Sequence, residues 1–135
     1  MIALDTNVLA RYLLTDDRKQ AKIATALLEG QDQFTAPPTV ILELVWVLES
    51  CDCARPDVVK GLRLLFGLPN FKPKEPEALW FALAWYEQGM DFGDALHIAL
   101  SAKDEGFVTF DRALVKLAKK VGPVPQVRSP SASGS

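Results

Sequence analysis

Two short β-rich runs each end in an aspartate and pass directly into helical spacing. Residues 1–4 form an apolar run before Asp5, and residues 107–110 form a second run before Asp111. The apolar residues that follow each aspartate recur at the spacing of an amphipathic helix. Strands that alternate with helices favour an α/β fold with a parallel sheet, whose ligand sites lie at the carboxyl ends of the strands. We therefore expect Asp5 and Asp111 to lie close together if their strands are neighbours.

The rest of the chain is predicted to be mostly helical and to form one domain. At 135 residues and 49% hydrophobic, it is long enough for one compact core and too short for two ordinary ones. A single domain is expected over residues 1–128, and residues 129–135, Ser-Pro-Ser-Ala-Ser-Gly-Ser, are predicted to be a disordered Ser/Pro-rich tail. Helices are expected from residue 16 up to Gly30, over residues 39–49, 56–66 and 77–89, and from residue 93 onward, with weak strands at 33–35 and 70–72.

Charge and hydropathy restrict the classes of partner. The net charge is -2 and the sequence pI is about 5.4, so no overall basic field is present to hold a long nucleic acid. Any nucleic-acid contact must therefore be local. No apolar run is long enough to span a bilayer, and the N-terminus enters a strand pattern without a basic region and signal core. We expect a cytoplasmic protein without a membrane partner.

Glu43 interrupts an almost wholly apolar helical stretch, residues 39–49. Such a helix is expected to be largely buried, and carboxylates are rarely buried without a partner. A metal ion would satisfy Glu43 well. A salt bridge to an arginine, or a position at an exposed edge of the helix, remains open as the alternative.

Asp91 and Asp94 stand at the opening of the helix predicted from residue 93. A carboxylate in a first helical turn is stabilised in its charged form by the helix dipole, which suits cation binding. His97 follows Asp94 by three residues and so shares its face. As the single histidine of the chain, it is interpreted as a packed or hydrogen-bonded residue without a catalytic role. For Asp5, Asp91 and Asp94, helix N-capping remains an alternative function.

Four acids gathered in one cleft would repel one another and recruit a cation. Two carboxylates about 4 Å apart repel by about 1 kcal/mol even in bulk water, and by more in a cleft. Oxygen ligands without a cysteine or histidine set indicate Mg²⁺ or Mn²⁺. Such a site produces a metal-bound hydroxide and stabilises the leaving oxygen of a phosphodiester. The pattern therefore predicts phosphodiester hydrolysis.

The ordered set of these motifs resembles a PIN-domain ribonuclease, and more closely the VapC toxins of bacterial toxin–antitoxin pairs. The similarity extends from Met1 to about Val127, and four segments carry it: Leu4-Asp5-Thr6-Asn7-Val8-Leu9, Glu43, Asp91-Phe92-Gly93-Asp94-Ala95-Leu96-His97-Ile98-Ala99 and Thr109-Phe110-Asp111-Arg112. The resemblance implies a three-layer α/β/α fold with a central parallel sheet. It also implies Mg²⁺- or Mn²⁺-dependent endonucleolytic cleavage of RNA, a homodimer, and inhibition by a VapB-type antitoxin.

The resemblance also assigns roles to individual residues. The family's catalytic and metal-binding acids match Asp5, Glu43, Asp94 and Asp111, and Asp91 is an accessory ligand candidate. Polar positions that support the site match Thr6, Asn7 and Thr109. The antitoxin is expected to place an amphipathic segment in an apolar groove between helices.

Basic residues near two of these acids are candidates for RNA contact. Arg112, Lys116 and Lys119 share a helical face after Asp111, and Arg11 follows Asp5 on the first helix. They could steer a phosphate backbone toward the metal site. The alternative is a solvated helix face without a ligand.

Two other classes of protein share features with this sequence. A haloacid-dehalogenase-type phosphohydrolase needs a second aspartate two residues after the first, and this chain has Asn7 there. A catalytically inactive PIN-fold module that binds RNA or protein is the stronger rival, because a fold does not fix a function.

Overall fold

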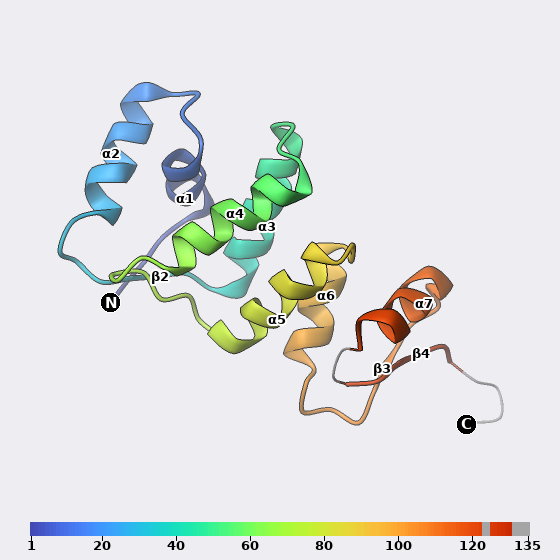
Figure 1. Ribbon diagram of the computed structural model, residues 1–135. Coiled ribbons are helices and arrows are strands. Elements are labelled where there is room, and N and C mark those ends of the chain that lie inside the picture. The colour runs from blue at the N-terminus through green and yellow to red at the C-terminus, as the bar shows by residue number, and fades with distance from the viewer. Residues whose placement is uncertain (123–124, 131–135) are drawn as a thin grey trace. The chain divides into compact units, whose positions relative to one another are not determined.

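The computed structural model describes residues 1–122 and 125–130, and the chain divides into two compact units, Met1–Pro76 and Glu77–Ser135. Figure 1 shows the helices and strands of each unit along the chain. Ser129 and Pro130 follow the last strand without regular structure. The rest of the tail predicted to be disordered, residues 131–135, lies outside the described residues.

The first unit contains four helices and a pair of parallel strands among its described residues. In chain order they are β1 (Ile2–Ala3), α1 (Thr6–Leu13), α2 (Arg18–Leu28), β2 (Phe34–Thr35), α3 (Pro38–Ser50) and α4 (Arg55–Phe66). Helix α1 packs against α2 and α3, and α3 packs against α4. Strand β1 pairs with β2 in parallel, with Ile2 opposite Phe34 and Ala3 opposite Thr35. The strand predicted at residues 70–72 is reduced to one parallel bridge, between Phe71 and Phe34.

The second unit repeats the parallel pairing with a different pair of strands. Its described elements are α5 (Pro76–Glu87), α6 (Phe92–Leu100), β3 (Phe107–Val108), α7 (Arg112–Val121) and β4 (Val127–Arg128). Strand β3 pairs with β4 in parallel, and the Thr109 amide extends the ladder by donating to the Arg128 carbonyl at 3.0 Å. Helix α7 packs against β4. Strand β4 was not predicted from the sequence, whereas the α/β class with parallel strands is confirmed.

The apolar residues of each helix explain which face it buries. Helix α3 buries Ile41, Leu44, Val45 and Leu48, which recur at helical spacing. Its opposite face carries Glu43 and Trp46, and both are exposed. The prediction that this helix is largely buried therefore holds for one face only. The apolar residues on nearly every position of this stretch conceal the helical period, since Trp46 looks like a core residue in the sequence although its side chain is 52% exposed.

Helix α7 is fixed at both ends by local backbone chemistry. Asp111 is its N-cap, and Gly122 ends it in the left-handed region at φ 72°. The Gly122 amide donates to the Ala118 carbonyl at 2.7 Å, which closes the last turn. These two caps set where the basic face of the helix begins and ends.

Within residues 1–122 and 125–130, no helix is long and apolar enough to cross a membrane.

Replacing Leu44 by alanine should destabilise the protein strongly, because this side chain is completely buried. A buried Leu→Ala change costs about 2–5 kcal/mol from lost burial and the cavity left behind. Trp46→Ala on the same helix should cost clearly less, since half of that side chain already meets solvent. Urea unfolding followed by circular dichroism measures both, and equal losses would contradict the one-sided burial of α3.

Candidate functional site

Asp5 follows β1 and caps helix α1. Its Oδ1 accepts a hydrogen bond from the Thr6 amide at 2.7 Å, so the capping alternative is realised. No hydrogen bond to its second oxygen is recorded within the described part of the chain, and the residue is exposed. Asp5 thus combines a structural hydrogen bond with a carboxylate oxygen that remains open to a ligand.

Thr6 and Asn7 lie beside Asp5 in different environments. Thr6 is 6% exposed, and in the described part of the chain its buried Oγ1 has no hydrogen-bond partner. A buried polar group left unsatisfied costs about 1–3 kcal/mol, so this hydroxyl is suited to bind a water or ligand atom next to Asp5. Asn7 is exposed and lines a hollow between α1 and α2.

Glu43 does not need the compensating partner that the sequence suggested. It lies on the solvent face of α3, so the exposed-edge alternative is correct and the prediction of a buried carboxylate is wrong. An exposed carboxylate can bind a cation without first paying a large desolvation cost. Its role as a metal ligand stays a prediction.

Asp91 and Asp94 have different positions at the start of α6. Asp91 is the N-cap, and its Oδ2 accepts from the Asp94 amide at 3.0 Å. Asp94 stands in the first turn and is half-buried. The capping alternative therefore holds for Asp91, and the carboxylate of Asp94 is left for another function.

Asp111 follows β3 and caps α7, and its acceptor bond reaches three residues along the chain, whereas that of Asp5 reaches only the next residue. Its Oδ1 accepts from the Leu114 amide at 3.0 Å. The Thr109 hydroxyl oxygen accepts from the Asp111 amide at 3.1 Å. Thr109 therefore fixes the backbone of Asp111, and within the described residues its hydroxyl makes no hydrogen bond to a carboxylate.

The carboxylates of the second unit repel one another. Burial raises the pKa of Asp94 above its ordinary value, and the negative charges of Asp91 and Asp111 raise it further. His97, which is exposed, acts in the opposite direction and lowers that pKa. Asp91 and Asp94 from α6 and Asp111 from α7 thus share one electrostatic environment, in which a cation would be stabilised.

The chemistry of these carboxylates suits a hard divalent cation, although the described residues do not form a complete metal site. All the candidate ligands are carboxylates, which Mg²⁺ and Mn²⁺ prefer. Among the described residues, no group of three or more histidine, cysteine or acidic side chains is arranged to hold a metal ion. The repulsion at Asp94 and the unpaired Thr6 hydroxyl are the two observations that favour a ligand. That Asp5 and Glu43 join the acids of the second unit stays a prediction.

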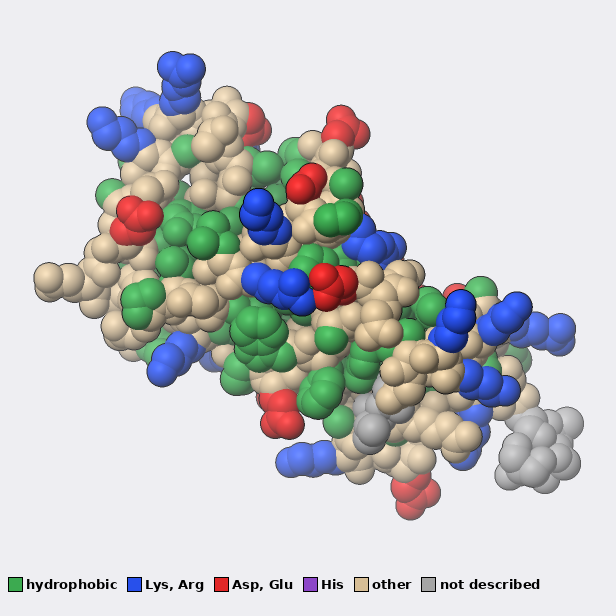
Figure 2. Space-filling model, viewed as in Figure 1, with side chains coloured by type: hydrophobic (Ala, Val, Ile, Leu, Met, Phe, Trp, Pro, Cys, Tyr) green, Lys and Arg blue, Asp and Glu red, His purple; other side chains and the backbone are tan. Residues whose placement is uncertain are grey.

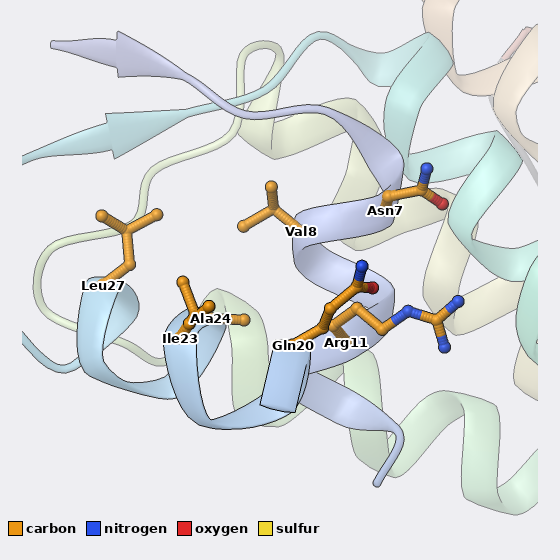
Figure 3. Close-up of a pocket in the computed structure, with 7 residues that line it drawn as sticks. All are labelled: Asn7, Val8, Arg11, Gln20, Ile23, Ala24 and Leu27. Atoms are coloured by element: carbon orange, nitrogen blue, oxygen red, sulfur yellow. The ribbon is translucent and has the colours of Figure 1, made fainter. Parts of the chain in front are cut away.

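An apolar hollow of about 230 Å³ is lined by residues of both α1 and α2. Figure 3 shows Val8 of α1 on one side and Ile23, Ala24 and Leu27 of α2 on the other. Arg11 reaches its polar rim, where Nη1 pairs with Asp16 Oδ1 at 2.7 Å. This hydrogen bond is the main reason why the pKa of Asp16 is lowered. One sequence signal points to the hollow, because Ile23 and Leu27 are four residues apart and therefore lie on the same side of α2.

The predicted RNA-contact residues of α7 are all exposed. Arg112, Lys116 and Lys119 lie on the solvent side of the helix, whereas Arg11 is held in the ion pair described above. Sequence reasoning missed two neighbours with similar exposure, Phe110 and Lys120. Phe110 directly precedes Asp111, and Lys120 directly follows Lys119. In the sequence Phe110 looks like a packing residue, and only its exposure in the structure shows that it is not one.

Comparison with known families decides the class of this protein. A family model described as PIN domain matches residues 2–120, which is most of the chain. The chain belongs to the PIN domain family. The predicted resemblance to this family is confirmed, and the match gives a PIN domain with a nuclease-type fold. A search of curated proteins finds no match. The match runs through both units, and the prediction of a single domain over residues 1–128 stays a prediction.

The raised pKa of Asp94 has a consequence for the stability of this PIN domain without metal. A carboxyl whose pKa is higher in the folded than in the unfolded state binds its proton more tightly when folded. The free energy of unfolding therefore falls as pH rises from the unfolded-state pKa through the folded-state pKa. Asp94→Asn should therefore stabilise the protein at pH 7 in EDTA. The gain should vanish below the ordinary aspartate pKa of about 3.9, where both states are protonated.

Asp111→Asn tests the same coupling from the other side. Removing this negative charge should lower the pKa of Asp94, measured by NMR titration of its side-chain carboxyl carbon. Asp104→Asn is the matched control, because Asp104 is exposed and is not among the groups that shift Asp94. An unchanged Asp94 titration in the Asp111 variant would show that the two carboxylates do not interact.

Proposed function

We propose that this PIN domain is a metal-dependent endoribonuclease that hydrolyses RNA phosphodiester bonds. The observation that carries the proposal is the group of mutually repelling carboxylates, Asp91, Asp94 and Asp111, at the starts of two helices. A bound cation would relieve the repulsion that Asp91 and Asp111 exert on Asp94.

The proposed cation is Mg²⁺ or Mn²⁺, held by Asp5, Glu43, Asp94 and Asp111. When bound, it supplies activation of a water molecule and neutralisation of charge on the scissile phosphate. Asp91 fixes the first turn of α6 through its cap and is an accessory ligand. Thr109 holds the backbone of Asp111, and the unpaired Thr6 hydroxyl is available to orient a water near Asp5.

We further propose that the enzyme is the toxin of a VapBC-type pair and acts in the cytoplasm as a homodimer. Regulation then falls to a VapB-type antitoxin with an amphipathic segment. The hollow between α1 and α2 supports this part of the proposal, because it is apolar inside and Ile23 and Leu27 are exposed on its wall. An apolar surface of this kind is suited to a helical or extended peptide.

Asp5→Asn should reduce RNA cleavage by at least about a hundredfold, since even outer partners of metal ligands are worth about 10–100-fold. Asparagine keeps the oxygen that accepts from the Thr6 amide, so the helix cap and the fold should be retained. The assay uses a labelled mixed RNA pool with Mg²⁺ or Mn²⁺, an EDTA control, and circular dichroism of both proteins. Asp32→Asn, at an exposed loop acid of the same unit, is the matched control. If wild type and Asp5→Asn behave alike, the cleavage is a contaminant or absent, which would overturn the proposal and favour the inactive binding module.

Mg²⁺ or Mn²⁺ should stabilise the folded protein, and the gain should grow with the free metal concentration. At a free concentration 100 times the Kd, binding to the native state alone adds about 2.7 kcal/mol to the free energy of unfolding. Thermal unfolding with increasing metal measures this gain, which should be largely lost in Asp94→Asn and Asp111→Asn. A metal-dependent rise of the same size in both variants would show that these aspartates are not ligands.

A further inference from the structure

Basic charge is concentrated in the last part of the chain. Residues 107–130 contain five basic residues and one acid, a net charge of +4, although the whole chain carries -2. Residues 77–106 of the same unit contain six acids and one lysine, a net charge of -5. The single acid of the basic segment is Asp111, a proposed metal ligand. The local basic surface that a nucleic acid requires therefore begins at the proposed site.

Helix α7 presents most of this charge on one side. It buries Leu114 and Ala118 and exposes four cations, and it contains no acidic residue. The four are Arg112, Lys116, Lys119 and Lys120. Figure 2 shows lysine and arginine side chains gathered over the region of α7. For these four residues, no ion pair is recorded within the described part of the chain.

Helix stability alone does not explain this arrangement. Lys119 and Lys120 in the last turn complement the helix dipole, which is an ordinary structural role. Arg112 stands in the first helical position, where the dipole disfavours a cation. An anionic ligand that approaches the start of α7 would account for Arg112 as well as for the lysines.

The lysines also line open hollows on the surface. Lys116, Lys119 and Lys120 border a hollow of about 520 Å³ together with Ala113 and Leu117. Lys119 borders a second hollow of about 200 Å³ formed with the start of β4. Long lysine side chains can follow such apolar walls while their ammonium groups stay in solvent to meet phosphates.

Phe110 places an exposed aromatic ring directly before Asp111. Its side chain is 89% exposed, although an apolar residue in front of a helix N-cap commonly packs against the fourth helical residue, here Val115. Phe110 therefore does not serve as a packing staple. An exposed aromatic ring beside a track of cations is the combination with which proteins bind single-stranded nucleic acids.

We propose that Phe110 and the basic face of α7 form a platform for single-stranded RNA, named here the α7 platform: Phe110, Arg112, Lys116, Lys119 and Lys120. A base stacks on Phe110, the cations pair with successive phosphates, and the strand passes Asp111 between them. The strand is single because the bases of a duplex are stacked and unavailable to the ring. The inference rests on the proposed ribonuclease function and identifies how its substrate is held.

Binding without cleavage tests the platform separately from catalysis. Affinity for a short labelled single-stranded RNA is measured in EDTA by fluorescence anisotropy at several salt concentrations. Lys116→Gln/Lys119→Gln/Lys120→Gln should weaken binding and make the slope of log affinity against log salt shallower by about 2, since each phosphate contact contributes about 0.7. Lys19→Gln/Lys22→Gln/Lys60→Gln removes the same charge from exposed positions of the first unit and should bind as wild type. Equal losses in both triple variants would overturn the platform.

The aromatic part of the platform has its own test. Phe110→Leu should weaken binding by about 5- to 100-fold, the range expected for one base–aromatic stack, with the salt slope unchanged. Phe110→Trp keeps a ring face and should restore affinity. Phe81→Leu is the control, because Phe81 is half-exposed and stacks on Trp85 within α5. Equal binding by Phe110→Leu and wild type, or equal affinity for a duplex, would overturn the stacking role.

Cleavage distinguishes failure of the platform from failure of the proposed function. If the wild type cleaves RNA with Mg²⁺ or Mn²⁺ and the platform variants cleave dilute RNA equally well, the platform is wrong and the ribonuclease stands. If the wild type binds RNA through the platform but cleaves none with either metal, the ribonuclease is wrong and the binding surface stands.

Discussion

Three aspartates at helix starts hold the candidate site in place through their N-cap hydrogen bonds. Asp5, Asp91 and Asp111 each accept a backbone amide proton from the helix they precede, at 2.7, 3.0 and 3.0 Å. A cap of this kind is worth about 1 kcal/mol and also fixes the side chain that provides it. The carboxylates are thus positioned by the same bonds that begin the helices. The capping role of these residues is compatible with their proposed role as metal ligands, because each cap uses one carboxylate oxygen.

Opposing electrostatic effects set the pKa of Asp94 in the second unit. The start of α6 favours a charged Asp94, whereas burial and two neighbouring carboxylates disfavour it, and the raised pKa shows that the unfavourable effects prevail. Without a bound cation, keeping these charges together lowers the free energy of unfolding. Catalytic sites commonly accept such a loss, because groups arranged to bind a cation or a transition state repel one another when it is absent.

Sequence patterns predicted the helices well and the exposure of individual residues poorly. The change from apolar run to helical spacing at Asp5 and Asp111 marked two strand–helix junctions, because turns and caps depend on local residue types. Strand β4 was missed although other strands of two residues were predicted, because no apolar run marks it and it lies between Pro125 and Pro130. Glu43 was expected to be buried because its neighbours are apolar, and only the packing of α3 reveals that Trp46 shares its exposed face. Phe110 was likewise read as a strand residue, and sequence alone does not give its exposure.

The N-caps have a consequence for which cations the site can accept. In each capping aspartate one oxygen already accepts an amide proton, so the other oxygen is the better placed donor for a metal ion. Calcium favours six to eight oxygens, often with bidentate carboxylates, whereas magnesium keeps an octahedral shell with several waters. Carboxylates restricted to one donor oxygen leave much of a coordination shell to solvent and substrate. In the proposed metal site, the capping bonds of Asp5 and Asp111 would therefore favour the smaller, more strongly hydrated ion.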